Sequence, residues 1–150
     1  MKTFVLTLST KFPATHYLRG QETDFFQKIK DGTKIHTIRA NFPLWKKRFE
    51  KINAGEACLS IRYWTGKPYA SKQEEFLKLT KDDGIGIQVL QFNNSDVEFP
   101  KIVKQYTTEW VERGILAKND GLSLDDFVNW FKGYDLSNPL AIIHFTKFRY

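Results

Sequence analysis

The chain has 150 residues, enough for one domain with a sizeable core, and its 23 basic residues outnumber its 17 acidic ones to give a formal net charge of +6. With 41% apolar and 27% charged residues, the composition excludes a disordered chain. Aromatic residues make up 15%. Cations neutralise phosphates and rings stack on bases, so this mixture hints at a nucleic-acid or nucleotide partner. The simpler interpretation is an aromatic core beneath a lysine-rich surface.

Several classes of protein are disfavoured by what the sequence lacks. Cys58 is the single cysteine, so one chain can form neither a disulfide nor a cysteine zinc cluster, and its β-like surroundings indicate a core thiol rather than a nucleophile. The three histidines are far apart, without metal-ligand spacing, and we expect no metal and no cofactor. No apolar run approaches the roughly 18 to 20 residues of a membrane span, and the run at 4–8 is too short for a signal peptide. We therefore expect a cytoplasmic protein without a membrane partner.

The first part of the chain predicts a strand, a loop and a short helix. Residues 4–9 form a β-like run, and residues 10–20 contain Pro13 and Gly20 and predict a loop. A helix is expected to begin at Glu22 or Thr23 and to place its apolar residues on one side: Phe25, Phe26 and Ile29. Asp31-Gly32 ends it, because glycine suits the left-handed position after a helix.

The next segment, Lys34 to Arg39, alternates with period two and predicts a strand. We expect one face to carry Ile35, Thr37 and Arg39, and the other to carry Lys34, His36 and Ile38.

A helix is predicted from Pro43 to about Asn53, where an apolar stripe recurs at steps of three, four and three: Phe42, Trp45, Phe49 and Ile52. Its basic residues form either a solvated face or a nucleic-acid site: Lys46, Lys47, Arg48 and Lys51. Residues 56–64 then give the clearest strand pattern.

The second half predicts a turn at 65–69, a short charged helix at 71–81 and a strand at 85–92. Residues 97–103 are expected to form either a further strand or an edge segment, which Pro100 interrupts. Thr107 or Thr108 is expected to cap a helix reaching Leu116. Ser123 and Asp126 predict a capping box for a further helix, and residues 140–150 a central strand. The sequence therefore predicts one α+β domain over 1–150, with five or six strands in a small, closed or partly closed β-barrel decorated by helices.

The segment Lys34 to Arg39 holds the strongest candidates for chemistry. A threonine hydroxyl such as that of Thr37 becomes a nucleophile only when a base removes its proton. Lys34 would serve as that base if its pKa, near 10.4 in water, fell by about three units, which costs about 4 kcal/mol. The alternative is a structural strand with Thr37 inside and two rim charges. Asp120 precedes Gly121 in a turn, and becomes catalytic only if the fold brings it to Lys34 and Thr37.

Four features follow one another along the chain: a helix ending in glycine (25–32), a Lys-x-x-Thr-x-Arg strand (34–39), a glycine followed by a strand (55–59), and an Asp-Gly turn before a helix (120–127) with a closing strand (141–145). In this order they resemble the ASCH domain family, a branch of the PUA-like β-barrels. Together they cover about residues 25–148. The resemblance implies a barrel with a cleft that holds RNA or a modified nucleoside.

Some bacterial members of this family are similar to acetylcytidine amidohydrolases. The resemblance therefore also implies a candidate catalytic site in this chain. Lys34 would match the base, Thr37 the nucleophile, Asp120 the carboxylate, and Arg39 an arginine facing the same cleft. That subgroup has a glutamate where this chain has Asp120, which is one methylene shorter. A displacement of about 1 Å can cost on the order of a hundredfold in rate.

Further ligand contacts are expected from Arg62, Trp64 and Tyr69, and residues 65–83 are expected to be an insertion in the domain. Trp64 and Tyr69 either stack on a base or pack a loop onto the barrel. Three hypotheses follow: a module that binds RNA or a modified nucleoside in a basic cleft, an amidohydrolase that removes an acyl group from a nucleobase amine, and a protein-interaction scaffold. The oligomeric state is left open.

Overall fold

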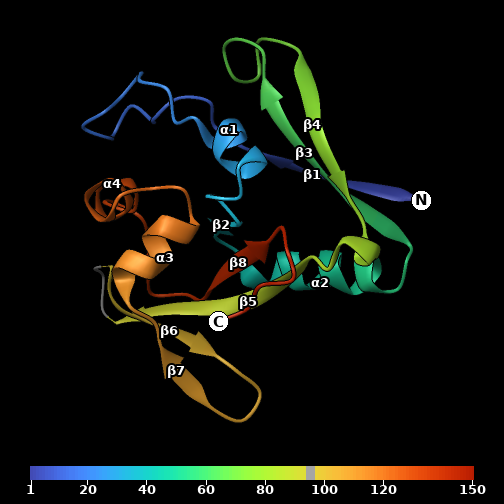
Figure 1. Ribbon diagram of the computed structural model, residues 1–150, viewed down its shortest axis with the longest axis vertical. Coiled ribbons are helices and arrows are strands. Elements are labelled where there is room, and N and C mark those ends of the chain that lie inside the picture. The colour runs from blue at the N-terminus through green and yellow to red at the C-terminus, as the bar shows by residue number, and fades with distance from the viewer. Residues whose placement is uncertain (94–96) are drawn as a thin grey trace.

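The computed structural model describes residues 1–93 and 97–150, and these form an α+β fold with two sheets and four α-helices (Figure 1). The three-stranded sheet has the order β1 (Lys2–Thr7), β3 (Ala57–Trp64), β4 (Gln73–Leu79). The five-stranded sheet has the order β2 (His36–Arg39), β8 (Leu140–His144), β5 (Gly86–Asn93), β6 (Glu98–Val103), β7 (Thr108–Trp110). The helices are α1 (Phe25–Lys30), α2 (Phe42–Asn53), α3 (Arg113–Asn119) and α4 (Leu124–Trp130), with a 3₁₀ turn η1 (Lys81–Asp83). The predicted α+β class is confirmed.

Strand pairing leaves four free edges. Within residues 1–93 and 97–150 the hydrogen-bonded order ends at β1 and β4 in one sheet and at β2 and β7 in the other, so no closed barrel is found. β1 runs parallel to β3, and every other pair is antiparallel. The free edge of β2 matters most, since it leaves one side of that strand open.

The predicted helix at 71–81 is wrong, because this segment forms β4 and pairs with β3 as a hairpin. Its charges suggested a helix, yet Glu74 and Glu75 lie exposed along a sheet edge while Leu77 and Leu79 pack on the core. Contacts with the neighbouring strand outweigh local propensity here.

The predicted helix cap at Thr107 or Thr108 is also wrong. Thr108 begins β7, and α3 starts only at Arg113, where the Glu112 side chain accepts hydrogen bonds from the amides of the first turn. With β4 and β7, the described residues form eight strands, compared with the five or six that the sequence predicted.

Pro100 lies in β6, between β5 and β7, rather than on an edge. The β5–β6 pairing shifts register there, from Asn93 opposite Glu98 to Gln91 opposite Lys101. Proline has no backbone N–H and cannot donate a hydrogen bond to a neighbouring strand. The bulge interrupts the regular pairing at Pro100, so no such hydrogen bond is needed there.

Other predicted elements are confirmed with small changes at their ends. The helices expected after residue 22, at 43–53 and after Ser123 are α1, α2 and α4, and the Ser123 side chain accepts a hydrogen bond from the Asp126 amide. Gly32 adopts the left-handed φ of 81° that the end of α1 requires. The final strand is central as predicted, because β8 lies between β2 and β5, although it ends at His144.

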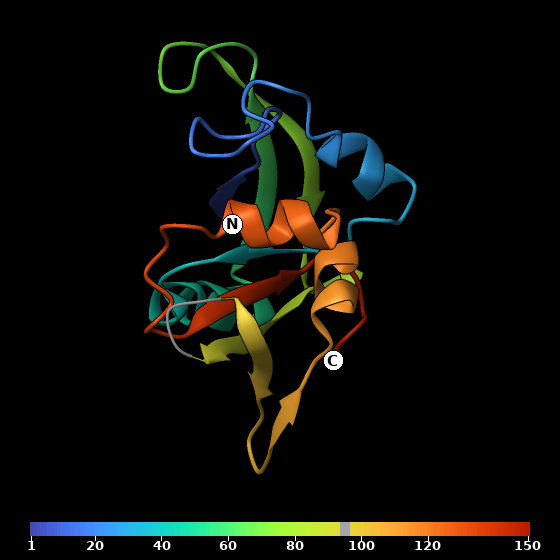
Figure 2. The ribbon, with the colours of Figure 1, turned by 90° about the vertical axis from the view of Figure 1, so that its left-hand side faces the viewer.

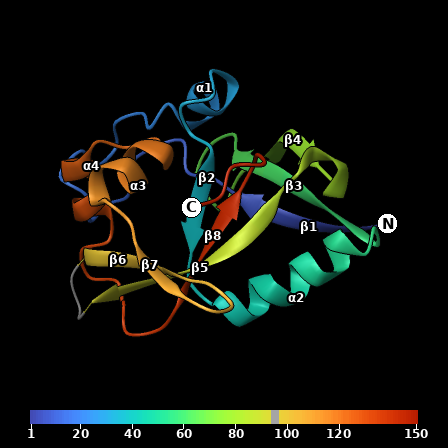
Figure 3. The same cartoon turned by 60° about the horizontal axis from the view of Figure 1, so that its bottom comes forward.

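Alternate residues of β8 face two separate cores. Leu140 and Ile142 belong to a core with α3 and α4, whereas Ala141 and Ile143 belong to a core with α2 and the three-stranded sheet. The helices accordingly cover opposite faces of the five-stranded sheet (Figure 3). Buried Cys58 lies in β3, as the core interpretation predicts.

The three-stranded sheet and the loop after β3 lie on one side of β2, and the rest of the five-stranded sheet lies on the other (Figure 2). The two sheets are linked where the Arg39 guanidinium donates a 2.6 Å hydrogen bond to the carbonyl of Thr7. Among the helices described, none has the length and apolar character that crossing a membrane requires.

Candidate functional site

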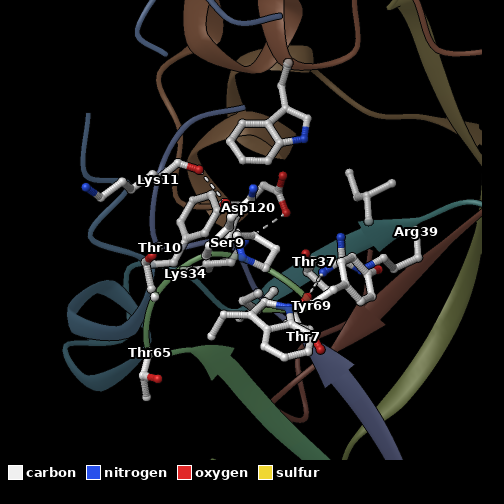
Figure 4. Close-up of a pocket in the computed structure, with 18 of the residues that line it drawn as sticks. Thr7, Ser9, Thr10, Lys11, Lys34, Thr37, Arg39, Thr65, Tyr69 and Asp120 are labelled. Carbon is white, nitrogen blue, oxygen red and sulfur yellow. Dashed lines mark hydrogen bonds and ion pairs between the residues drawn. The ribbon is translucent and has the colours of Figure 1, made fainter. Parts of the chain in front are cut away.

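A pocket of about 690 Å³ opens at the free edge of β2 (Figure 4). Its walls come from the end of β1 and the following loop, from β2, from the loop after β3, and from α4 with the turn before it. The predicted site residues that line it are Lys34, Thr37, Arg39, Trp64, Tyr69 and Asp120. The structure thus brings together residues that lie up to 86 positions apart in the sequence.

Arg62 is the predicted site residue that does not line this pocket. Its Nε donates to the Ser60 hydroxyl at 2.8 Å, and its guanidinium lies 3.9 Å from Glu75. These contacts belong to the β3–β4 hairpin, where Arg62 has a carboxylate partner of its own.

Lys34 is almost completely buried, with 1% of its surface exposed. It follows the Gly32 turn after α1 and comes just before β2. Its Nζ donates to the carbonyl of Asp120 at 2.6 Å, lies 3.3 Å from Asp120 Oδ1, and stands 4.2 Å from the centre of the Phe25 ring. Burial lowers the pKa of Lys34 to about 8, an effect that Asp120 opposes and nearby Arg39 reinforces.

Thr37 lies in β2 opposite Ile143, and its side chain lines the pocket with only 5% of the residue exposed. Within the described residues no hydrogen bond joins the Thr37 hydroxyl to Lys34, whose ammonium contacts Asp120 instead. Lys34 and Thr37 were expected on opposite faces of a strand, yet both line the pocket. Lys34 precedes the strand, and the open edge of β2 admits side chains from either side.

Asp120 is the C-cap residue directly after α3, and Gly121 follows it. Gly121 has φ of 81°, and a Cβ placed there would come within 3.0 Å of Lys34 Cβ. Only a glycine allows the chain to take this turn and pack so closely on Lys34. Asp120 Oδ1 is contacted by both Lys34 Nζ and His36 Nδ1, each at 3.3 Å.

The sequence analysis did not predict a chain of hydrogen bonds that runs from Asp120 through His36 to Tyr150. His36 Nε2 lies 2.6 Å from the hydroxyl of Tyr150, which also accepts a 3.0 Å hydrogen bond from the Asn119 side chain. Burial lowers the pKa of His36 and raises that of Tyr150. The position of His36 in the alternating segment was visible, but no pattern links it to a tyrosine 114 residues away.

His144 lies beside this chain in β8, paired with His36 across the strands. Its Nε2 contacts Gln88 Oε1 at 2.9 Å, and burial lowers its pKa to about 3. Its Nδ1 is the one buried side-chain nitrogen or oxygen in the described part of the chain that has no hydrogen-bond partner. With so low a pKa, the His144 ring is neutral near pH 7, and it lies beside the hydrogen-bonded chain of His36 and Tyr150.

Aromatic rings supply much of the rest of the pocket. Trp64 and Tyr69 contact each other with ring centres 5.1 Å apart, and Tyr69 is 91% exposed. On the inner wall the rings of Phe25 and Trp130 lie 5.6 Å apart. The contact between Trp64 and Tyr69 agrees with the prediction that they pack the loop. Because both also line the pocket, the alternative prediction, that they stack on a base, stays open.

Across residues 1–93 and 97–150 no three His, Cys, Asp or Glu side chains are grouped so that they could hold a metal ion. The pocket offers a lysine, a hydroxyl, a guanidinium and a carboxylate, which can bind polar groups and transfer protons.

Comparison with known proteins gives no match: no family model, no curated protein and no solved structure is significantly similar to this chain.

Proposed function

We propose that the pocket binds a modified nucleoside, either free or as part of an RNA. The observation that carries this proposal is the lining itself, where Lys34, Thr37, Arg39 and Asp120 share one cavity with the rings of several aromatic residues. Hydrogen-bonding groups fix the edge of a base, and rings stack on its faces. A volume of about 690 Å³ lies within the usual range of small-molecule sites.

The resemblance to the ASCH family supports the same proposal, because the matching residues Lys34, Thr37, Arg39 and Asp120 all line the cavity. A PUA-like barrel is the finer form of this fold proposal. The two sheets and the bond from Arg39 to Thr7 at their junction are compatible with an open relative of that barrel.

Binding is tested by titrating the protein with a panel of modified nucleosides at low salt and following tryptophan fluorescence, since Trp64 and Trp130 both line the pocket. We expect at least one nucleoside to quench the fluorescence saturably, and Arg39→Ala to weaken its binding. Lys47→Ala serves as the control, because Lys47 is exposed on α2 and absent from the lining. If no nucleoside binds at low salt, or if Arg39→Ala changes nothing, the proposal is wrong.

A second candidate function is hydrolysis of an acylated nucleobase amine such as acetylcytidine. It is favoured by one specific observation: a buried lysine whose pKa is lowered to about 8 shares the pocket with a threonine and an aspartate. Neutral Lys34 would turn from Asp120 to Thr37 and take the hydroxyl proton while Thr37 Oγ1 bonds to the acyl carbon. The carbon–nitrogen bond then breaks, the amine leaves with a proton relayed through Asp120, and water hydrolyses the threonine ester. Arg39 or backbone amides would stabilise the oxyanion.

This reaction is tested by measuring release of cytidine from acetylcytidine. Wild-type turnover should rise as the pH passes through about 8, because the neutral form of Lys34 is the base. Thr37→Ala should abolish turnover and Thr37→Ser should retain part of it. Turnover that survives Thr37→Ala would eliminate the proposed nucleophile.

A further inference from the structure

Charge in the pocket lining is strongly unbalanced. Four cationic side chains line it, namely Lys11, Lys34, Arg39 and Lys67, against one acidic side chain, Asp120. That carboxylate already faces Lys34 and His36 inside the protein. The remaining cations are therefore available to a ligand.

Among the described residues, no salt bridge joins Arg39 to a carboxylate. Arg39 is partly buried, and its pKa is lowered by that burial. Its protein hydrogen bond goes to the neutral carbonyl of Thr7. Arg62 makes a useful contrast, because its guanidinium lies near Glu75.

Buried or partly buried charges in proteins are normally paired. A guanidinium carries five donors in a planar fork that matches the oxygens of phosphate. One donor of Arg39 is used by Thr7, and no other described residue accepts a hydrogen bond from its guanidinium, so the other donors can contact a ligand in the pocket.

Two further lysines stand at the mouth. Lys11 and Lys67 are exposed residues of the loops after β1 and β3. Figure 4 shows Lys11 next to Thr10 at one side of the pocket, with its ammonium pointing outward from the other side chains drawn. Like charges gathered around one opening raise the local concentration of anions and speed their entry.

We propose that the ligand of this pocket carries a phosphate group, which Arg39 binds and which Lys11 and Lys67 attract. The proposal rests on the nucleoside-binding function above and narrows its ligand to a nucleotide or a nucleotide unit of an RNA chain. The aromatic rings then contact the base while the guanidinium supplies the counter-ion of the phosphate.

The test compares cytidine, cytidine 5′-monophosphate and a cytidine dinucleotide, together with the acetylated form of each, by fluorescence titration of the whole chain. We expect the monophosphate to bind roughly 10- to 100-fold more tightly than the matching nucleoside at low salt, as charge-assisted hydrogen bonds predict. The advantage should shrink as salt rises. A dinucleotide that exceeds the monophosphate would identify RNA as the source of the phosphate, and the reverse order would identify a free nucleotide.

Variants separate the phosphate contribution from that of the base. Arg39→Gln should remove most of the monophosphate's advantage, and Lys11→Gln and Lys67→Gln should each reduce it by a factor of roughly two to five, with little effect on the nucleoside. Lys46→Gln, on the exposed face of α2 and outside the lining, should leave it intact. The ligand comparison needs no variant, so a folding defect in Arg39→Gln leaves the test valid.

The outcomes distinguish the two proposals. Nucleosides and nucleotides that bind equally well would overturn the phosphate proposal and leave the nucleoside site standing. Equal losses in Lys11→Gln and Lys46→Gln would overturn it too. Failure of every nucleoside and every nucleotide to bind would refute the proposed function itself.

Discussion

Replacing Lys34 with methionine should change how the stability of the fold depends on pH. Burial lowers the pKa of Lys34 from 10.5 to about 8, so between these values the folded chain holds fewer protons than the unfolded chain. The free energy of unfolding therefore rises with pH in this window, and the contribution disappears as pH falls toward 8. At 1.36 kcal/mol per pH unit, the rise between pH 8 and 9.5 is about 2 kcal/mol. Methionine is an unbranched apolar side chain, and it removes the titrating ammonium that lies 4.2 Å from the centre of the Phe25 ring.

Urea denaturation at pH 7, 8, 9 and 9.5 measures this contribution. The series stops below pH 10, because the raised pKa of Tyr150 makes the opposite contribution above it. Lys47→Met on the surface of α2 should keep the wild-type dependence, whereas Lys34→Met should flatten it by about 2 kcal/mol. Identical pH slopes in the wild type and Lys34→Met would refute the claim that Lys34 is buried with a lowered pKa.

Three further substitutions probe the packing around the pocket. Tyr150→Phe removes the hydroxyl shared by His36 and Asn119 and should lower the free energy of unfolding by about 1–2 kcal/mol in urea denaturation; no change would show that this hydrogen-bonded chain contributes nothing. Gly121→Ala should cost more than the roughly 1–2 kcal/mol of Gly32→Ala, since both have φ of 81° but only the former meets Lys34 Cβ at 3.0 Å; equal costs would contradict the close approach. Tyr69→Ala should weaken nucleoside binding by about 1–3 kcal/mol in fluorescence titration without lowering the melting temperature, because Tyr69 is 91% exposed, and unchanged affinity would remove it from the site.

Local signals in the sequence predicted the elements that depend on local chemistry. The apolar stripe of α2 repeats along about three turns of one helix, and the Ser123 cap of α4 involves residues only three positions apart; both elements form as expected. β4 and β7 were missed because each is stabilised by pairing with a neighbouring strand, which the local composition does not encode. Their strand character could be recognised only by knowing their partners.

In the candidate site, too, the sequence predicted the individual residues but not how they come together. Lys34, Thr37 and Arg39 were visible as a short pattern, and Asp120 as a turn residue before a capped helix. Their meeting depends on the contact between the start of β2 and the end of α3, where the amide of Ile35 donates to the carbonyl of Asn119. No spacing in the sequence reveals this contact.

The roles of the residues that contact Asp120 from inside the protein were even harder to predict. His36 was placed on a strand face without a role, and Tyr150 was treated as the end of a strand. The structure shows that a tail folding back from β8 carries the Tyr150 hydroxyl to His36. Because the segment after β8 folds back onto His36, the contact between Tyr150 and His36 depends on the tertiary fold. It leaves no periodic pattern in the sequence.

We propose that the pocket at the edge of β2 binds a nucleoside or nucleotide. A titration of isotope-labelled protein with acetylcytidine 5′-monophosphate, followed by two-dimensional NMR of the backbone amides and tryptophan indoles, tests this proposal directly. Saturable shifts concentrated at Thr37, Arg39, Trp64 and Trp130, which line the pocket, are the predicted result. An absence of shifts, or shifts confined to surfaces away from these residues, would contradict it.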